Sequence, residues 1–177
     1  MTDQQTKPVA PKKTLAAVLG GAAIAAAALA FTSGKEGVAL TPYRDTLAGG
    51  VSTVCFGDTQ VKQRRYSLEE CLALLEPRMV QYAEPVRAAT PGFAGLTPGQ
   101  KIAVVDFTYN VGVANYQAST LRRRYIARDF PAACDEFLRW RYTGVPKRDC
   151  SVKSNGCGGI WTRRQEERAL CRGENVK

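Results

Sequence analysis

The stretch that decides the fold runs from residue 36 to residue 59 and reads EGVALTPYRDTLAGGVSTVCFGDT. It is rich in β-branched residues and turn formers, and Gly49-Gly50 is followed by a strand-like run, so it predicts a β-hairpin. Glu36 stands at its start and Asp45 just before the turn. A hairpin can bring these carboxyls to face each other across a cleft, where paired carboxylates perform acid–base chemistry. By spacing alone, a Glu and an Asp nine residues apart are usually two surface charges.

The residue types that are missing restrict the chemistry further. The 177-residue chain contains no histidine, which excludes a Ser-His-Asp triad, a Cys-His pair, histidine metal ligands and a histidine general base. Catalysis must then rest on carboxylates, hydroxyls, Cys, Lys, Arg or Tyr, and we expect no metal and no cofactor. The 25 Lys and Arg residues outnumber the 16 Asp and Glu residues, giving a net charge of +9. This excess suits an anionic partner such as a nucleic acid, a phospholipid surface or a bacterial wall polymer.

The N-terminal part has the length of a membrane span but little hydrophobicity. Residues 14–33 carry no charge, and nine of these 20 residues are Ala. Their helical length matches the ~30 Å hydrocarbon core of a bilayer. The basic residues in 1–13 favour a cytoplasmic N-terminus and an exported domain at 34–177. A cleaved signal peptide and a permanent anchor remain alternatives to an anchor that later lets go, which fits both the length and the weak hydrophobicity.

All six cysteines follow this segment, and an even count in an exported domain indicates disulfides. A short loop separates Cys150 from Cys157, so we pair these two. The pairs Cys55–Cys71 and Cys134–Cys171 then remain, although the sequence leaves other connectivities open. A zinc site is disfavoured because there is no C-x-x-C motif and no histidine.

Capping boxes and prolines predict the helices that follow the hairpin. The predicted ranges are 67 to about 81, 98–110, 131 to about 141, and 162 to about 172. The second is apolar on most sides and is expected to be the buried central helix. The predicted fold class is therefore α+β, mostly helical with a small β-hairpin lobe, preceded by the releasable membrane-spanning helix.

The opening stretch resembles the catalytic motif of bacteriophage lysozymes (endolysins) of glycoside hydrolase family 24, especially the subgroup with an N-terminal signal-arrest-release segment. That motif is Glu, eight residues, Asp, five residues, Thr. Glu36, Gly37, Tyr43 and Asp45 match in place, and the run from Thr53 matches the strand that follows. The resemblance recurs at 67–75, 107–112, 119–121, 133–140 and 161–168, and so covers nearly all of the chain after residue 35. It implies a lysozyme-like fold.

The sequence departs from that motif in two places. Seven residues, rather than five, separate Asp45 from Thr53, so Ser52 or Thr46 could supply the hydroxyl instead. Asp58 stands where members often have a histidine, which we interpret as structural rather than catalytic. We also expect the insertion at 148–159, with its two cysteines, to form a disulfide-clamped surface loop.

The resemblance implies a muramidase that cuts the β-1,4 bond between N-acetylmuramic acid and N-acetylglucosamine of peptidoglycan during host cell lysis. By this analogy Glu36 is the general acid, Asp45 acts on a water from the opposite face, and Thr53 helps to hold that water. Such an inverting scheme needs carboxyls roughly 6.5–9.5 Å apart, whereas a spacing near 5 Å favours a retaining route. The candidates for lining the glycan cleft are Tyr109, Asn110, Arg163 and Arg164.

The position of Glu36 just beyond residues 14–33 suggests regulation. In the host inner membrane the segment would hold Glu36 at the lipid surface, and after release to the periplasm its Ala-rich helix could pack onto the domain. The expected partners are peptidoglycan and, before release, the inner membrane; export removes nucleic acid as a partner, and we expect a monomer. Two alternatives remain: a lytic transglycosylase acting on the same bond, and a non-enzymatic cationic protein that binds the cell wall from the membrane.

Overall fold

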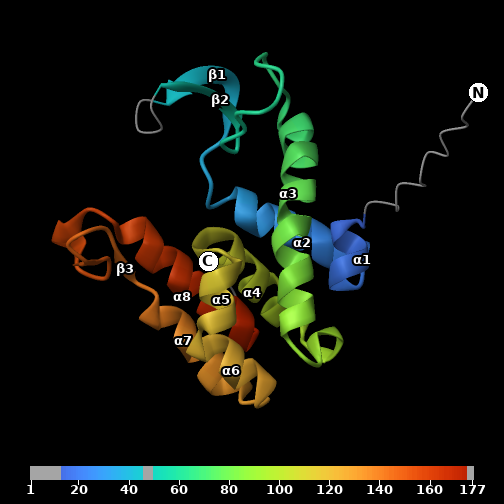
Figure 1. Ribbon diagram of the computed structural model, residues 1–177, viewed down its shortest axis with the longest axis vertical. Coiled ribbons are helices and arrows are strands. Elements are labelled where there is room, and N and C mark those ends of the chain that lie inside the picture. The colour runs from blue at the N-terminus through green and yellow to red at the C-terminus, as the bar shows by residue number, and fades with distance from the viewer. Residues whose placement is uncertain (1–12, 46–49, 175–177) are drawn as a thin grey trace, which may run out of the picture.

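Helices dominate the computed structural model, which describes residues 13–45 and 50–174 (Figure 1). The first half contains α1 (Leu15–Leu19), α2 (Ala22–Ser33), β1 (Ala39–Asp45), β2 (Val51–Cys55) and α3 (Leu68–Ala89). The second half contains α4 (Pro98–Val111), α5 (Val113–Ala118), α6 (Thr120–Ile126), α7 (Phe130–Glu136), β3 (Tyr142–Thr143), β4 (Arg148–Asp149) and α8 (Gly158–Arg172). Both β-sheets are two-stranded and antiparallel. The predicted α+β class with a small hairpin lobe is confirmed.

The β1–β2 hairpin forms a small lobe beside the start of α3, apart from the other helices (Figure 1). Its register pairs Tyr43 with Thr53 and Asp45 with Val51, and the pairing shifts between residues 39 and 43. The disulfide Cys55–Cys71 ties β2 to the first turn of α3. The turn at 46–49 lies outside the described residues.

α3 begins as predicted but continues beyond residue 81. The side chain of Ser67 accepts from the N–H of Glu70, and that of Glu70 accepts from the N–H of Ser67, so the capping box is present. The helix runs on through Pro77 and Pro85 to Ala89. A proline inside a helix removes one hydrogen bond, but the buried stripe continues past both at helical spacing and outweighs this loss. The stripe consists of Cys71, Leu75, Met79, Ala83 and Val86.

α4 is the buried central helix. A capping box between Thr97 and Gln100 starts it, and it ends at Gly112, both as predicted. Every residue from 100 to 108 is buried. α4 packs against α8, α3 and α2, so it lies between the N-terminal segment and the C-terminal helix.

Gly99 allows α4 and α8 to approach closely, because a β-carbon there would collide with the carbonyl group of Leu170. We expect Gly99→Ala to lower the free energy of unfolding by about 2 kcal/mol, since the obstacle is backbone and both helices must shift. Thermal denaturation of Gly99→Ala measures this, with Gly95→Ala as the matched control, since nothing lies within 4 Å of a β-carbon at that position. Alanine is the better helix former, so a rise in melting temperature for Gly99→Ala would contradict the close approach.

The C-terminal helices differ from prediction mainly in their bounds. α7 is shorter than predicted and passes into a 3-10 turn at Phe137–Arg139. α8 begins at Gly158, four residues before the predicted start at Thr162, and ends as predicted before Gly173, whose φ is +73°. The disulfide Cys134–Cys171 joins α7 to α8.

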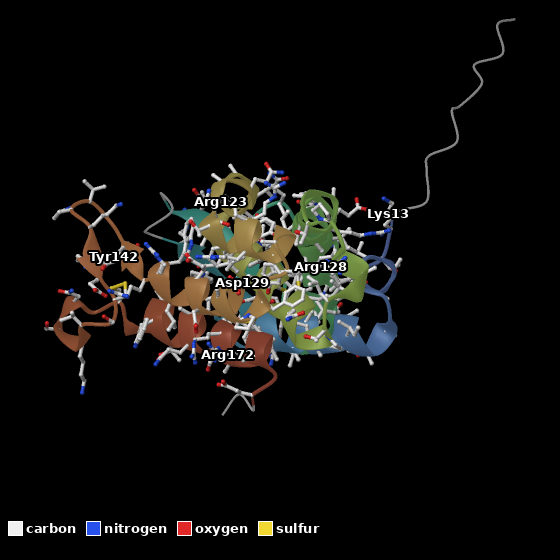
Figure 2. The ribbon with its side chains drawn as sticks, turned by 90° about the horizontal axis from the view of Figure 1, so that it is seen from below. Lys13, Arg123, Arg128, Asp129, Tyr142 and Arg172 are labelled. Carbon is white, nitrogen blue, oxygen red and sulfur yellow. A yellow bond between two sulfur atoms is a disulfide. The ribbon has the colours of Figure 1, made fainter. Side chains whose placement is uncertain are left out.

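Residues 141–157 form an arm that projects from one end of the molecule. Figure 2 shows Tyr142 on this arm, with a disulfide beside it. That disulfide is Cys150–Cys157, and the side chain of Val145 is fully exposed. The predicted clamped surface loop is confirmed, and all three predicted disulfide pairs are present.

The segment predicted as one helix at 14–33 is two helices in the structure. Thr14 caps α1, which ends at Gly20 in the left-handed conformation (φ +96°), and α2 starts at Ala22. The two helices pack against α3 and α4 and bury Leu15, Leu19 and Ala28 completely. No helix among residues 13–45 and 50–174 combines the length and the hydropathy that a bilayer crossing requires. The basic residues 1–12 lie outside the described residues.

Candidate active site

Glu36 projects from the turn that follows α2. Its backbone N–H donates to the carbonyl of Thr32, 3.2 Å away, which places the residue just past the helix end. Its side chain is 30% exposed, and Oε1 accepts a hydrogen bond from Nη1 of Arg163 at 2.7 Å. The described residues donate no hydrogen bond to Oε2. The carboxyl is thus fixed through one oxygen while the other is available to a ligand.

Arg163 connects Glu36 to the central helix. Its Nε and Nη2 donate to the two carboxylate oxygens of Asp106, each at 2.9 Å. Asp106 is fully buried on α4 and Arg163 nearly so on α8. Burial lowers the pKa of Arg163, but the hydrogen bonds and charges of Asp106 and Glu36 outweigh it and raise the pKa above its ordinary value. Arg163 is therefore a permanent cation with a fixed orientation beside Glu36.

A second buried pair lies next to the first. Arg164 and Glu167 are both fully buried and lie 3.2 Å apart. Burial raises the pKa of Glu167 well above its ordinary value and lowers that of Arg164. Nη2 of Arg164 also donates to Oδ1 of Asn110 at 2.7 Å. Arg164 was expected to line a cleft, but its side chain is fully buried and holds Asn110, which lines the cavity described next.

A cavity of about 560 Å³ opens beside this network. Its volume is in the range of ordinary ligand pockets. The lining residues come from the end of α2, the end of α4 and the start of α8, and they are Gly34, Lys35, Asn110, Gly159, Ile160, Thr162, Arg163 and Glu166. Lys35 and Glu166 form an ion pair within it. Of the four residues predicted to line a glycan cleft, Asn110 and Arg163 face this cavity.

Tyr109 lies half-buried on α4 and contacts α3. Its ring meets that of Tyr82 edge-on with centroids 5.1 Å apart, and the Arg78 guanidinium lies 5.7 Å from its centroid. Burial raises the pKa of Tyr109, opposed by Arg78 and supported by Glu36, so the side chain is a neutral phenol. Arg78 also donates to Oδ1 of Asp58 at 3.2 Å. The aspartate that replaces the expected histidine therefore ties the hairpin lobe to α3.

The other two predicted catalytic residues lie in the hairpin. Asp45 is the last residue of β1, opposite Val51, and its side chain is outside the described atoms. Thr53 is 2% exposed, and its hydroxyl donates to the carbonyl of Val51 at 3.2 Å. Ser52 is exposed and its hydroxyl donates to Oε1 of Gln63 at 3.0 Å. Thr46 lies outside the described residues, so the choice of hydroxyl stays a prediction.

Two acidic residues of the network were not predicted from the sequence. Asp106 and Glu167 both lie completely buried beside Arg163. Asp106 had a signal, since it is the only acidic residue of the apolar helix at 98–110. A charge in such a helix requires a buried partner of opposite sign.

The phage lysozyme family model matches residues 33–167, which begins just before Glu36 and ends within α8. The chain belongs to the phage lysozyme family. As a phage lysozyme it is a glycoside hydrolase, as predicted. The SAR-endolysins of Enterobacteria phages PA-2 and P21 are each 33% identical to it over 172 residues, covering 93% of this chain and 96% of the relative. The SAR-endolysin of Escherichia phage Mu is 37% identical over 139 residues, 76% of this chain and 72% of the relative.

Solved structures agree on the fold of this phage lysozyme. The endolysin of Escherichia coli O157:H7 phage FAHEc1 superposes with a TM-score of 0.70 at 21% identity, covering 85% of this chain and 94% of that one. A mutant of P22 lysozyme superposes with a TM-score of 0.68 at 22% identity, covering 82% and 95%. The lysozyme-like fold predicted from the sequence is confirmed.

Proposed function

We propose that this phage lysozyme hydrolyses the β-1,4 bond between N-acetylmuramic acid and N-acetylglucosamine of peptidoglycan and thereby lyses the host cell. The observation that carries the proposal is the setting of Glu36. Its Oε1 accepts a hydrogen bond at 2.7 Å from Arg163, and Arg163 lines a cavity of about 560 Å³. Family membership supplies the reaction class.

Glu36 is the group that gives a proton to the leaving glycosidic oxygen. The network contains three carboxyls (Glu36, Asp106 and Glu167) but only two guanidinium groups, Arg163 and Arg164. One proton on a carboxyl therefore makes the network neutral. Of the three, only Glu36 is exposed, since Asp106 and Glu167 are fully buried. The proton that reaches a substrate must pass through Glu36.

Residues of the hairpin position and activate the water that completes hydrolysis. Asp45, at the end of β1, acts on this water from the opposite face of the sugar, and Thr53 or a neighbouring hydroxyl helps to hold it. These two roles rest on the sequence motif. In this inverting scheme the water lies between the carboxyls, which takes a separation of roughly 6.5–9.5 Å. Tyr109, Asn110 and Arg163 line the glycan cleft.

The N-terminal segment makes the activity of the enzyme depend on its release from the membrane. Residues 14–33 cross the host inner membrane with residues 1–13 in the cytoplasm, and the chain is later released to the periplasm as a monomer. Support comes from the uncharged run of 20 residues and from the relatives named SAR-endolysins, whose 93% coverage includes most of the residues before 33. In the membrane form Glu36 lies at the lipid surface, away from Arg163. After release, α1 and α2 pack as the structure has them and bring Glu36 to Arg163, which lines the cavity.

Product analysis tests the reaction. We expect purified protein to convert purified peptidoglycan into soluble muropeptides with a reducing N-acetylmuramic acid end, each cut adding one water. Mass spectrometry after borohydride reduction identifies that end, and digestion in ¹⁸O-water labels it. Anhydro ends would identify a lytic transglycosylase instead. If no soluble products form, the remaining interpretation is that the protein binds the cell wall and has no catalytic activity.

A further inference from the structure

Lys101 is a buried lysine that the catalytic site does not use. It lies on α4 with 7% of its surface exposed, and its Nζ donates to the carbonyl oxygen of Leu19 at 3.1 Å. The ring of Phe93 lies 5.8 Å from the ammonium. Lys101 forms no ion pair within residues 13–45 and 50–174. An ammonium group buried without a carboxylate depends strongly on each hydrogen bond it makes, so the contact with Leu19 is important to its position.

The carbonyl of Leu19 is one of those that lose their helical partner at the break in the N-terminal helix. In an unbroken helix it would accept the N–H of residue 23. In the structure the chain turns at Gly20, and the N–H groups of Gly20 and Gly21 both donate to the carbonyl of Ala16 at 2.9 Å. Lys101 therefore donates to a carbonyl oxygen that has lost its helical partner because residues 15–33 form two helices.

The opposite end of α1 is held in a complementary way. Oε1 of Glu76 on α3 accepts the N–H of Leu15 at 3.2 Å. An acidic group at the N-terminal end and a cation at the C-terminal end both match the helix dipole. The domain thus contacts both ends of α1 through charged side chains.

We infer that Lys101 is a positioning residue for Glu36, because it holds residues 15–33 in the broken, two-helix form. The link runs through α2, whose Ala25, Ala28 and Thr32 are buried against the domain, while the carbonyl of Thr32 accepts the N–H of Glu36. The inference rests on the proposed function. In that proposal residues 15–33 form one unbroken helix in the membrane, and the Lys101 contact stabilises the alternative form with two helices. Loss of the Lys101 contact shifts the equilibrium of residues 15–33 toward the unbroken helix. It also makes the position of the end of α2, and so of Glu36, less fixed.

Variants of the full-length chain test this role. Lys101→Met keeps the length of the side chain but removes the donor, and Lys101→Arg retains a cation. We expect Lys101→Met to delay lysis, to increase the membrane-retained fraction, and to lower kcat of the released protein about 10-fold without changing KM. Lys101→Arg should restore part of the normal lysis time, release and kcat. Gly20→Ala disfavours the left-handed conformation at the break. It should therefore delay lysis and increase membrane retention, as Lys101→Met does.

A double variant and a stability control distinguish positioning from general destabilisation. Lys101→Met and Gly20→Ala disturb the same break, so together they should have little more effect than the stronger one alone. Leu121→Ala removes a buried side chain on α6, which packs against α5 and α7, and should lower stability without increasing membrane retention. The inference is overturned if the two effects add fully, or if Lys101→Met changes retention and kcat no more than Leu121→Ala does.

Glu36→Gln in the same assays separates the two proposals. If Glu36→Gln still hydrolyses peptidoglycan, the proposed function fails. If Glu36→Gln is inactive while Lys101→Met is released and hydrolyses like the unmodified chain, only the inference about Lys101 fails.

Discussion

Glu36→Gln is expected to slow peptidoglycan hydrolysis by about 10²–10⁴-fold, the usual contribution of a general acid. Glutamine has the same size and keeps an oxygen that can accept the hydrogen bond of Arg163, which is 2.7 Å from Oε1 of Glu36. It has no acidic proton to give to the glycosidic oxygen. The measurement is the loss of turbidity of outer-membrane-permeabilised cells, together with the thermal melting of the purified variant.

Glu69→Gln is the matched control for this experiment. Glu69 is exposed in the first turn of α3 and forms no ion pair within the described part of the chain. The same chemical change there should leave the rate as it was and lower the melting temperature by a few degrees at most, since it removes only a favourable interaction with the N-terminus of α3. A Glu36→Gln enzyme that folds normally and clears cells at nearly the rate of Glu69→Gln would mean that the reaction does not use this carboxyl as its acid.

The parts of the fold that were predicted correctly depend on local interactions. The capping boxes at Ser67 and Thr97 act over three residues, so the sequence locates these helix starts to the residue. The short loop between Cys150 and Cys157 made that disulfide predictable in the same way. The end of α3 was wrong by eight residues, because a buried stripe packed against other elements carries the helix past Pro85. The stripe is visible in the sequence at helical spacing, but Pro85 is a local stop signal, and only the packing decides which of the two prevails.

Of the candidate site, the sequence predicted the residues that belong to the catalytic motif but not the buried network that orients Glu36. Glu36 was identified from its spacing to Asp45 and from the resemblance, yet it meets an arginine 127 positions away. Glu167 has no such motif. The sequence marks Asp106 only as a buried charge that requires a partner, and it does not identify that partner as Arg163. Hydropathy predicted one helix at 14–33, whereas its break is held by Lys101, 82 positions from Leu19. Interactions between such distant positions are decided by the packed structure.

The largest effect on stability is expected from Arg164→Met. This variant removes the guanidinium that lies 3.2 Å from Glu167, and both side chains are fully buried. Breaking a buried pair from one side leaves the other charge without its partner, which costs about 3–5 kcal/mol of unfolding free energy. For a domain of this size that lowers the melting temperature by about 10 °C. Thermal and urea denaturation of the purified protein measure it, with Arg172→Met, whose exposed pair with Asp135 contributes about 1 kcal/mol or less, as the control.

Two further measurements establish that Glu167 causes this loss. Arg164→Met combined with Glu167→Leu should recover most of the stability, because two apolar side chains then replace the pair and no charge is left buried. The stability of the single variant should also rise as the pH is lowered toward 4.5, the ordinary pKa of glutamate. Burial raises the pKa of Glu167 in the folded protein, so the folded state binds more protons than the unfolded state in this range, and acid favours it. A double variant less stable than Arg164→Met, or a single variant whose deficit is the same at pH 5 and pH 8, would show that the buried charge of Glu167 is not the cause.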